Sequence, residues 1–164
     1  HIATGDWNEE QDGGRPLAEA TDWLVAQHPD WEPYIRAFYG RWTEMLGGPI
    51  QPTVDLLEEL HTAKQKRLYA LTNWSAETWP HAWDRYPFLQ YFEGILVSGA
   101  ENMRKPDPRI YQLICERYDI VPQETVFIDD NLRNVKAAAA EGLIGIHFQT
   151  TDQVREELKY LGML

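Results

Sequence analysis

The sequence predicts a three-layer α/β protein, in which helices cover both faces of a parallel sheet, with a small helical segment ahead of it. From residue 49 onward, short apolar runs typical of strands alternate with longer stretches of helical periodicity, which is the order that a parallel sheet produces. The first 48 residues show helical periodicity alone. We therefore expect two domains, a helical one at 1–48 and an α/β core at 49–164.

Apolar residues at helical spacing define the first domain. Residues 15–29 carry Pro16 near a helix start, and residues 31–46 repeat the helical pattern. Glycine and proline are then concentrated in "GGPIQPT", residues 47–53, which is typical of a hinge. We place the domain boundary in this stretch.

The elements of the second domain alternate along the chain. We expect helix 53–64, strand 67–72, a helix from Ser75, strand 94–98, helix 107–118, strand 125–129, helix 132–142, a short strand 145–148 and a final helix from Asp152. In parallel sheets, ligands bind beyond the carboxyl ends of the strands, where loops and helix amino termini converge. The residues that follow each strand are therefore the candidates for a functional site.

Composition narrows the class of partner. The chain has 164 residues, 43% of them hydrophobic and 25% charged, as in soluble globular proteins, and its formal net charge is −11. This charge argues against binding to nucleic acid or to an anionic membrane surface, since both need clustered Lys and Arg. The single cysteine, Cys115, excludes a disulfide framework.

With no apolar leader and no membrane-length apolar run, we expect a cytoplasmic protein. The sequence does not indicate its oligomeric state.

Polar residues follow the first two strands of the core. Thr72 and Asn73 end the strand 67–72, and a hydroxyl beside free amides suits an anionic oxygen. Taken alone, Thr72 or Ser75 is more simply a helix cap. After the next strand, "KPDP" holds Lys105 on a proline-stiffened loop, with Asp107 as the expected cap of the following helix. The alternative for Lys105 is a solvated surface lysine.

Two adjacent carboxylates follow the third strand. Asp129 and Asp130 come directly after apolar residues, and Asn131 and Asn134 open the next helix. Hard oxygen ligands without nearby His or Cys favour Mg²⁺ over zinc. The alternative is that Asp130 or Asn131 caps the helix while Asp129 is exposed. Two acids, a lysine and a hydroxyl on three successive strand ends favour one shared site.

The motifs "LTNWS", "KPDP" and "FIDDNLRNV" resemble, in order and spacing, the second, third and fourth motifs of the haloacid dehalogenase-like hydrolase superfamily. The resemblance implies a Rossmann-like sheet with a helical cap, of which residues 1–48 would be a part. It also implies residue roles. Thr72 and the Asn73 amide would bind the oxygen of the transferring group, and Lys105 would neutralise the phosphate and the nucleophile. Asp130 would bind Mg²⁺, Asp129 would be a second ligand directly or through water, and Asn134 would stand where an aspartate is more usual. Trp74 is a candidate for the pocket wall.

The activity implied by the resemblance is that of a Mg²⁺-dependent phosphatase, a phosphoric monoester hydrolase that acts on a small phosphorylated metabolite through an aspartyl-phosphate. One alternative is a 2-haloacid dehalogenase, which uses no metal and does not need two adjacent acids after this strand. Another is a non-catalytic binding or regulatory protein on the same scaffold. The superfamily's first motif, a strand that ends in the nucleophilic aspartate, has no counterpart among these residues, so we expect further chain before His1 to supply it.

Overall fold

The computed structural model describes residues 2–164 and shows an α/β fold with two compact units. Unit 1 consists of the described residues up to Gly48 together with 71–87 and 97–104. Unit 2 consists of 49–70, 88–96 and 105–164. One boundary between the units therefore lies between Gly48 and Pro49, inside the predicted hinge.

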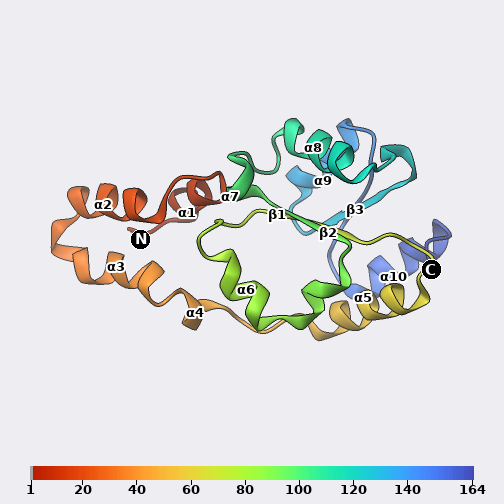
Figure 1. Cartoon of the computed structure of the whole chain (residues 1–164), viewed down its shortest axis with the longest axis horizontal. Coiled ribbons are helices and arrows are strands. Elements are labelled where there is room, and N and C mark those ends of the chain that lie inside the picture. The colour runs from red at the N-terminus through yellow and green to blue at the C-terminus, as the bar shows by residue number, and fades with distance from the viewer. Residues whose placement is uncertain (1) are drawn as a thin grey trace. The chain divides into compact units, whose positions relative to one another are not determined.

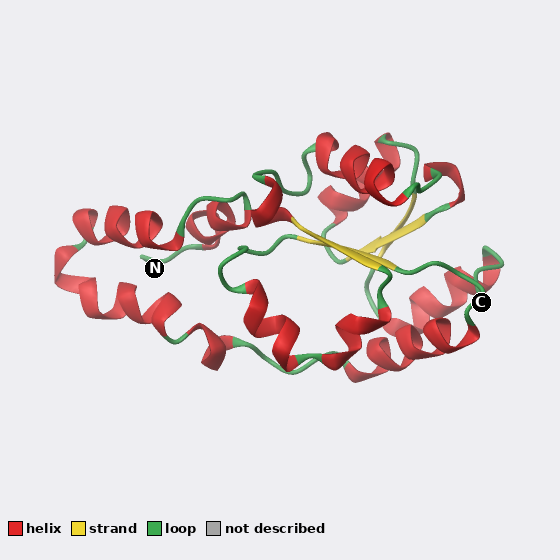
Figure 2. Ribbon diagram, viewed as in Figure 1, coloured by secondary structure: helices red, strands yellow, loops and turns green. Residues whose placement is uncertain are grey.

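Unit 1 is mainly helical. It contains α1 (Gly5–Asp12), α2 (Leu17–Gln27), the 3₁₀ turn η1 (Pro29–Trp31), α3 (Glu32–Gly40), α4 (Trp42–Met45), α6 (Trp79–Arg85) and α7 (Ser98–Glu101). Figure 2 shows the segment from residue 2 to residue 48 as helices and loops, without a strand. The apolar core of this segment is formed by Trp7, Ala20, Leu24 and Ile35, which α1, α2 and α3 contribute.

The helices of unit 1 differ from the prediction in two places. The single helix expected at 31–46 is interrupted at Arg41, directly after Gly40 ends α3; glycine is a poor helix former, which favours a break there. The helix α1 was not predicted. Its only buried residues are Trp7 and Gln11, so it has no apolar stripe from which periodicity could identify it.

Unit 2 forms three layers. It contains α5 (Gln51–Ala63), α8 (Pro108–Tyr118), the 3₁₀ turn η3 (Pro122–Glu124), β3 (Val126–Asp129), α9 (Leu132–Ala140), β4 (Ile144–His147) and α10 (Thr151–Tyr160). Strands β3 and β4 pair in parallel, with Val126 opposite Ile144 and Asp129 opposite His147. Figure 1 shows α8 and α9 on one face of this pair and α5 and α10 on the other.

Alternation of side chains along β4 explains how both faces are covered. Ile146 is buried with Leu56 of α5 and with Leu158 of α10. Its neighbour Gly145 points the other way, where an added Cβ would lie 2.7 Å from Val135 Cγ1 of α9. The absence of a side chain at Gly145 lets α9 pack closely on the strand. The predicted class, a three-layer α/β fold with parallel strands, is thus confirmed.

The remaining strands form a second sheet. β1 (Tyr69–Thr72) and β2 (Gly94–Val97) pair with each other, with the 3₁₀ turn η2 (Pro87–Tyr91) ahead of β2. Within residues 2–164, the strands therefore form two separate two-stranded sheets, β1–β2 and β3–β4. All four predicted strands are present; β1, β2 and β3 are slightly shorter than predicted, and β4 is shifted by one residue toward the amino terminus. No helix in the described part of the chain is both long and apolar enough to cross a membrane.

Candidate active site

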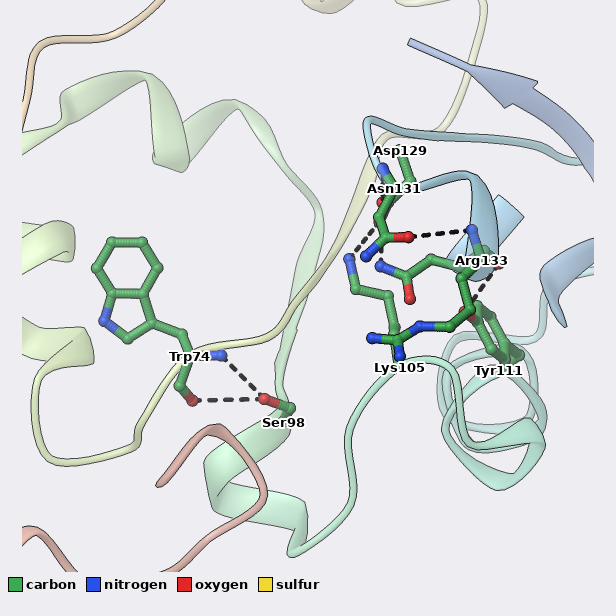
Figure 3. A network of polar contacts seen from close by, with 8 residues as sticks. Trp74, Ser98, Lys105, Tyr111, Asp129, Asn131 and Arg133 are labelled. Carbon is green, nitrogen blue, oxygen red and sulfur yellow. Dashed lines mark hydrogen bonds and ion pairs between the residues drawn. The ribbon is translucent and has the colours of Figure 1, made fainter. Parts of the chain in front are cut away.

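A buried ion pair lies at the carboxyl end of β3. Lys105 Nζ is 2.6 Å from Asp129 Oδ2, and the two side chains are only 10% and 5% exposed (Figure 3). The Lys105 ammonium also lies 5.6 Å from the centre of the Phe127 ring, a distance at which a ring face attracts a cation. The structure thus excludes the surface-lysine alternative, because Lys105 is buried and held by a specific carboxylate.

The second oxygen of Asp129 organises the start of α9. Asp129 Oδ1 accepts hydrogen bonds from the Asn131 backbone N–H at 2.8 Å and from Asn134 Nδ2 at 3.0 Å. Asn131 caps α9, since its side chain accepts from the Arg133 N–H. In addition, the buried Tyr111 hydroxyl donates to the Asn134 carbonyl at 3.0 Å, and burial raises the pKa of this phenol. Both oxygens of the Asp129 carboxylate therefore accept from donors of the chain.

Asp130 is in a different environment. Its side chain is exposed, whereas its backbone is fixed, because the Asp130 carbonyl bonds to His147 Nε2 at 2.9 Å. The Phe148 N–H donates to the neighbouring carbonyl of Asp129 at 2.9 Å. Strand β4 and the residue after it thus hold the chain at the end of β3, so that Asp130 presents its carboxylate to solvent from a fixed position.

These residues offer donors that suit Mg²⁺. Asn134 Oδ1 is buried and accepts no hydrogen bond from any residue in the range 2–164, and a buried acceptor without a partner is costly. The exposed Asp130 carboxylate and this amide oxygen are both hard oxygen ligands, and Mg²⁺ in proteins often takes only one or two carboxylates and keeps several waters. Among the described residues, no three His, Cys, Asp or Glu side chains gather as a metal site.

Thr72, Asn73 and Trp74 belong to unit 1, where β1 leads into a loop. The helix expected from Ser75 begins only at Trp79, after a turn at 75–78. The suggestion that Thr72 lies at a helix amino terminus is therefore wrong. Trp74 packs edge-to-face against Trp42 at 6.4 Å and Trp79 at 5.9 Å between ring centroids. Its role in a pocket wall stays a prediction.

Sequence reasoning missed two residues that contact this loop. The Ser98 hydroxyl accepts from the Trp74 N–H at 2.9 Å, and the Asp12 carboxyl accepts from the Ser75 backbone N–H. Ser98 directly follows β2, so the rule that residues after strands are candidates already pointed to it. Asp12 lies at the end of a helix, far from any strand in the sequence, and no local pattern identifies it.

Comparison with known proteins identifies relatives over most of the chain. A family model described as haloacid dehalogenase-like hydrolase matches residues 6–142. A sesquiterpene phosphatase of Aspergillus oryzae is 35% identical over 94 residues, which are 57% of this chain and 48% of that protein. A phosphorylated carbohydrates phosphatase of Thermotoga maritima is 34% identical over 63 residues, 38% of this chain and 29% of that protein. The chain thus spans about half or less of the length of these curated relatives.

Solved structures share the fold. A HAD family enzyme from Bacteroides thetaiotaomicron, crystallised as an Asp-to-Ala mutant with magnesium and inorganic phosphate, superposes with a TM-score of 0.66 and 26% sequence identity. The match covers 85% of this chain and 73% of that one. Sequence and fold therefore indicate the same family.

Proposed function

Because the chain belongs to the haloacid dehalogenase-like hydrolase family, we propose that it is part of a Mg²⁺-dependent phosphatase acting on a small phosphorylated metabolite. The observation that supports this best is the buried Lys105–Asp129 pair at the carboxyl end of β3. A fixed ammonium in a largely dry site stabilises the negative charge of a phosphoryl group much more strongly than a lysine in water does.

Each residue has one role in this proposal. Lys105 neutralises the phosphoryl oxygens and the nucleophile. Asp129 holds the Lys105 ammonium in position through its 2.6 Å contact and acts on Mg²⁺ only indirectly. Thr72 and the Asn73 amide orient an oxygen of the transferring group. Positioning and charge stabilisation are the main contributions that a protein makes to phosphoryl transfer.

Asp130 and Asn134 Oδ1 are the proposed protein ligands of Mg²⁺, which when bound would neutralise charge on the phosphoryl oxygens. Asp130 is exposed, whereas Asn134 Oδ1 is buried without a hydrogen bond in the described structure. This division of roles explains why two carboxylates stand side by side: Asp129 orients the lysine and the helix, and Asp130 faces the ligand.

The aspartyl-phosphate intermediate needs a nucleophilic aspartate. Among the described strands, β3 alone ends in an aspartate, and that residue, Asp129, is bound on both oxygens. We therefore propose that the nucleophile lies on a strand other than β1 to β4, and that residues 1–48 are part of the family's cap. Both assignments derive from the family's chemistry.

The test is phosphate release by the intact protein from a panel of sugar phosphates, flavin mononucleotide and sesquiterpenyl phosphates, with and without Mg²⁺. We expect turnover that requires Mg²⁺ and that chelation abolishes. Halide release from a 2-haloacid without metal would instead identify a dehalogenase. Binding of inorganic phosphate without turnover of any substrate would identify a binding protein.

A further inference from the structure

The loop after β1 is held by a fully buried hydroxyl. Ser98 is 0% exposed. Its Oγ accepts from the Trp74 N–H at 2.9 Å and donates to the Asp12 carbonyl at 2.6 Å (Figure 3 shows the contact with Trp74). A hydroxyl has one proton, so the short bond to Asp12 O uses it, and the lone pairs remain to accept from Trp74. Ser98 thus links the end of α1 to the loop within unit 1.

A second side chain holds the next peptide of the same loop. The Asp12 carboxyl accepts from the Ser75 backbone N–H. The pKa of Asp12 is raised to about 6, mainly by burial; Arg104 and the Ser75 N–H act to lower it, and Glu9 acts to raise it. Arg104 is itself paired with Glu9 at 2.7 Å. Two successive amides, those of Trp74 and Ser75, are therefore fixed by two side chains.

Helix α7 also packs directly on the backbone of this loop. The Gly99 N–H donates to the Trp74 carbonyl at 3.0 Å. A Cβ added at Gly99 would lie 2.5 Å from the Ala76 nitrogen and 2.7 Å from the Trp74 oxygen, which is too close for any side chain. The loop therefore has a fixed path, because hydrogen bonds hold its amides and the backbone of α7 lies against it.

On the basis of the proposed phosphatase function, we infer that Ser98 is a positioning residue, which with Asp12 fixes the loop that carries Thr72 and Asn73. The Trp74 N–H lies two residues beyond Thr72, so its hydrogen bond sets the direction of the peptides that follow the Thr72 hydroxyl and the Asn73 amide. A displacement of about 1 Å in groups that orient a substrate lowers the rate by as much as about 100-fold. Ser98 touches no substrate in this scheme and acts only through the loop.

The first test is Ser98→Ala in the intact protein, with Thr21→Ala as the matched control. Thr21 is also buried in unit 1, and its hydroxyl donates to the Leu17 carbonyl at 2.7 Å, so its loss has a comparable structural effect away from the loop. We expect Ser98→Ala to accelerate hydrogen exchange of the Trp74 amide about tenfold and to lower kcat about tenfold or more, with little change in KM. Thr21→Ala should leave both unchanged.

A second variant tests the same inference without removing the hydroxyl. Gly99→Ala should displace the loop and produce the same loss of kcat and of Trp74 amide protection. Gly40→Ala, where no atom lies within 4 Å of the added Cβ, is its control. This pair keeps the inference testable if Ser98→Ala does not fold.

Unchanged Trp74 exchange in both Ser98→Ala and Gly99→Ala would overturn the inference, as would an equal loss of kcat in Thr21→Ala. A wild-type protein without phosphatase activity would contradict the proposed function alone. Amide exchange requires no turnover, so faster Trp74 exchange in Ser98→Ala would still support the hold of Ser98 on the loop.

Discussion

Replacing Asp129 by asparagine tests the buried ion pair at the end of β3. The change keeps the shape of the side chain and removes its charge. One oxygen that now lies 2.6 Å from the Lys105 ammonium becomes an NH₂ donor, so two donors face each other. Because Lys105 is 10% exposed, its charge cannot reach solvent without movement of the chain. Breaking one side of such a pair costs about 3–5 kcal/mol.

This cost is a large part of the total for a typical domain, whose free energy of unfolding is about 5–15 kcal/mol. We therefore expect Asp129→Asn to unfold at much lower urea concentration than the wild type, followed by far-ultraviolet circular dichroism. Glu156→Gln is the control, because Glu156 pairs with Lys159 while 71% exposed, and such surface pairs contribute about 0–1 kcal/mol. If Asp129→Asn loses no more stability than Glu156→Gln, the pair does not hold Lys105 as described.

Three further predictions concern charge at and near the site. Lys105→Met should lower phosphatase activity by about 10²–10³-fold, since a fixed charge aimed at the phosphoryl group is lost. The control Lys66→Met, at a surface lysine, should not lower the activity. Near-normal activity in Lys105→Met would remove Lys105 from the mechanism. Asp130→Asn should abolish Mg²⁺ binding in calorimetry with the fold intact, because Asp130 is exposed; unchanged affinity would exclude it as a ligand. The pKa of Asp12 is raised from 3.8 to about 6, so the folded state holds this proton longer than the unfolded state does, and the contribution of Asp12 to stability falls as pH rises from about 4 to 6. Urea titrations at several pH values should show that Asp12→Asn removes this decrease in the free energy of unfolding. If the free energy of unfolding falls with pH as steeply in Asp12→Asn as in the wild type, the raised pKa of Asp12 is contradicted.

The pH prediction for Asp12 depends on the charges around it. Arg104 lowers its pKa and Glu9 raises it, while desolvation is the largest effect. Since Arg104 and Glu9 are paired with each other at 2.7 Å, their influences on Asp12 partly cancel. Burial of the carboxyl therefore determines the direction of the shift.

The sequence by itself determined the order of elements in unit 2 and indicated candidates for its site. Apolar runs at 67–72, 94–98 and 125–129 correspond to β1, β2 and β3, because buried parallel strands need continuous apolar residues. The cap at Asp107 and the cap at Asn131 are likewise local, since a side chain at the start of a helix bonds to amides two residues on. Lys105, Asp129 and Asn134 were named together as candidates from their places after strands.

The environment of each of these residues was decided by the tertiary structure. Adjacent aspartates look equivalent in the sequence, yet Asp129 is buried with Lys105 and Asn134 whereas Asp130 is exposed. The cause is a lysine 24 positions earlier in the chain, which the fold brings to the Asp129 carboxylate.

The loop after β1 depends still more on distant contacts. Its helix begins at Trp79 instead of Ser75, and the Ser75 amide bonds to Asp12. Ser98 lies 24 positions from its partner Trp74 in the chain, and Asp12 lies 86 positions from its partner Ser98. Periodicity and capping rules describe neighbours within about one or two helical turns, so they cannot foresee bonds across such separations; folding brings these segments together because the amides of a buried loop must find acceptors.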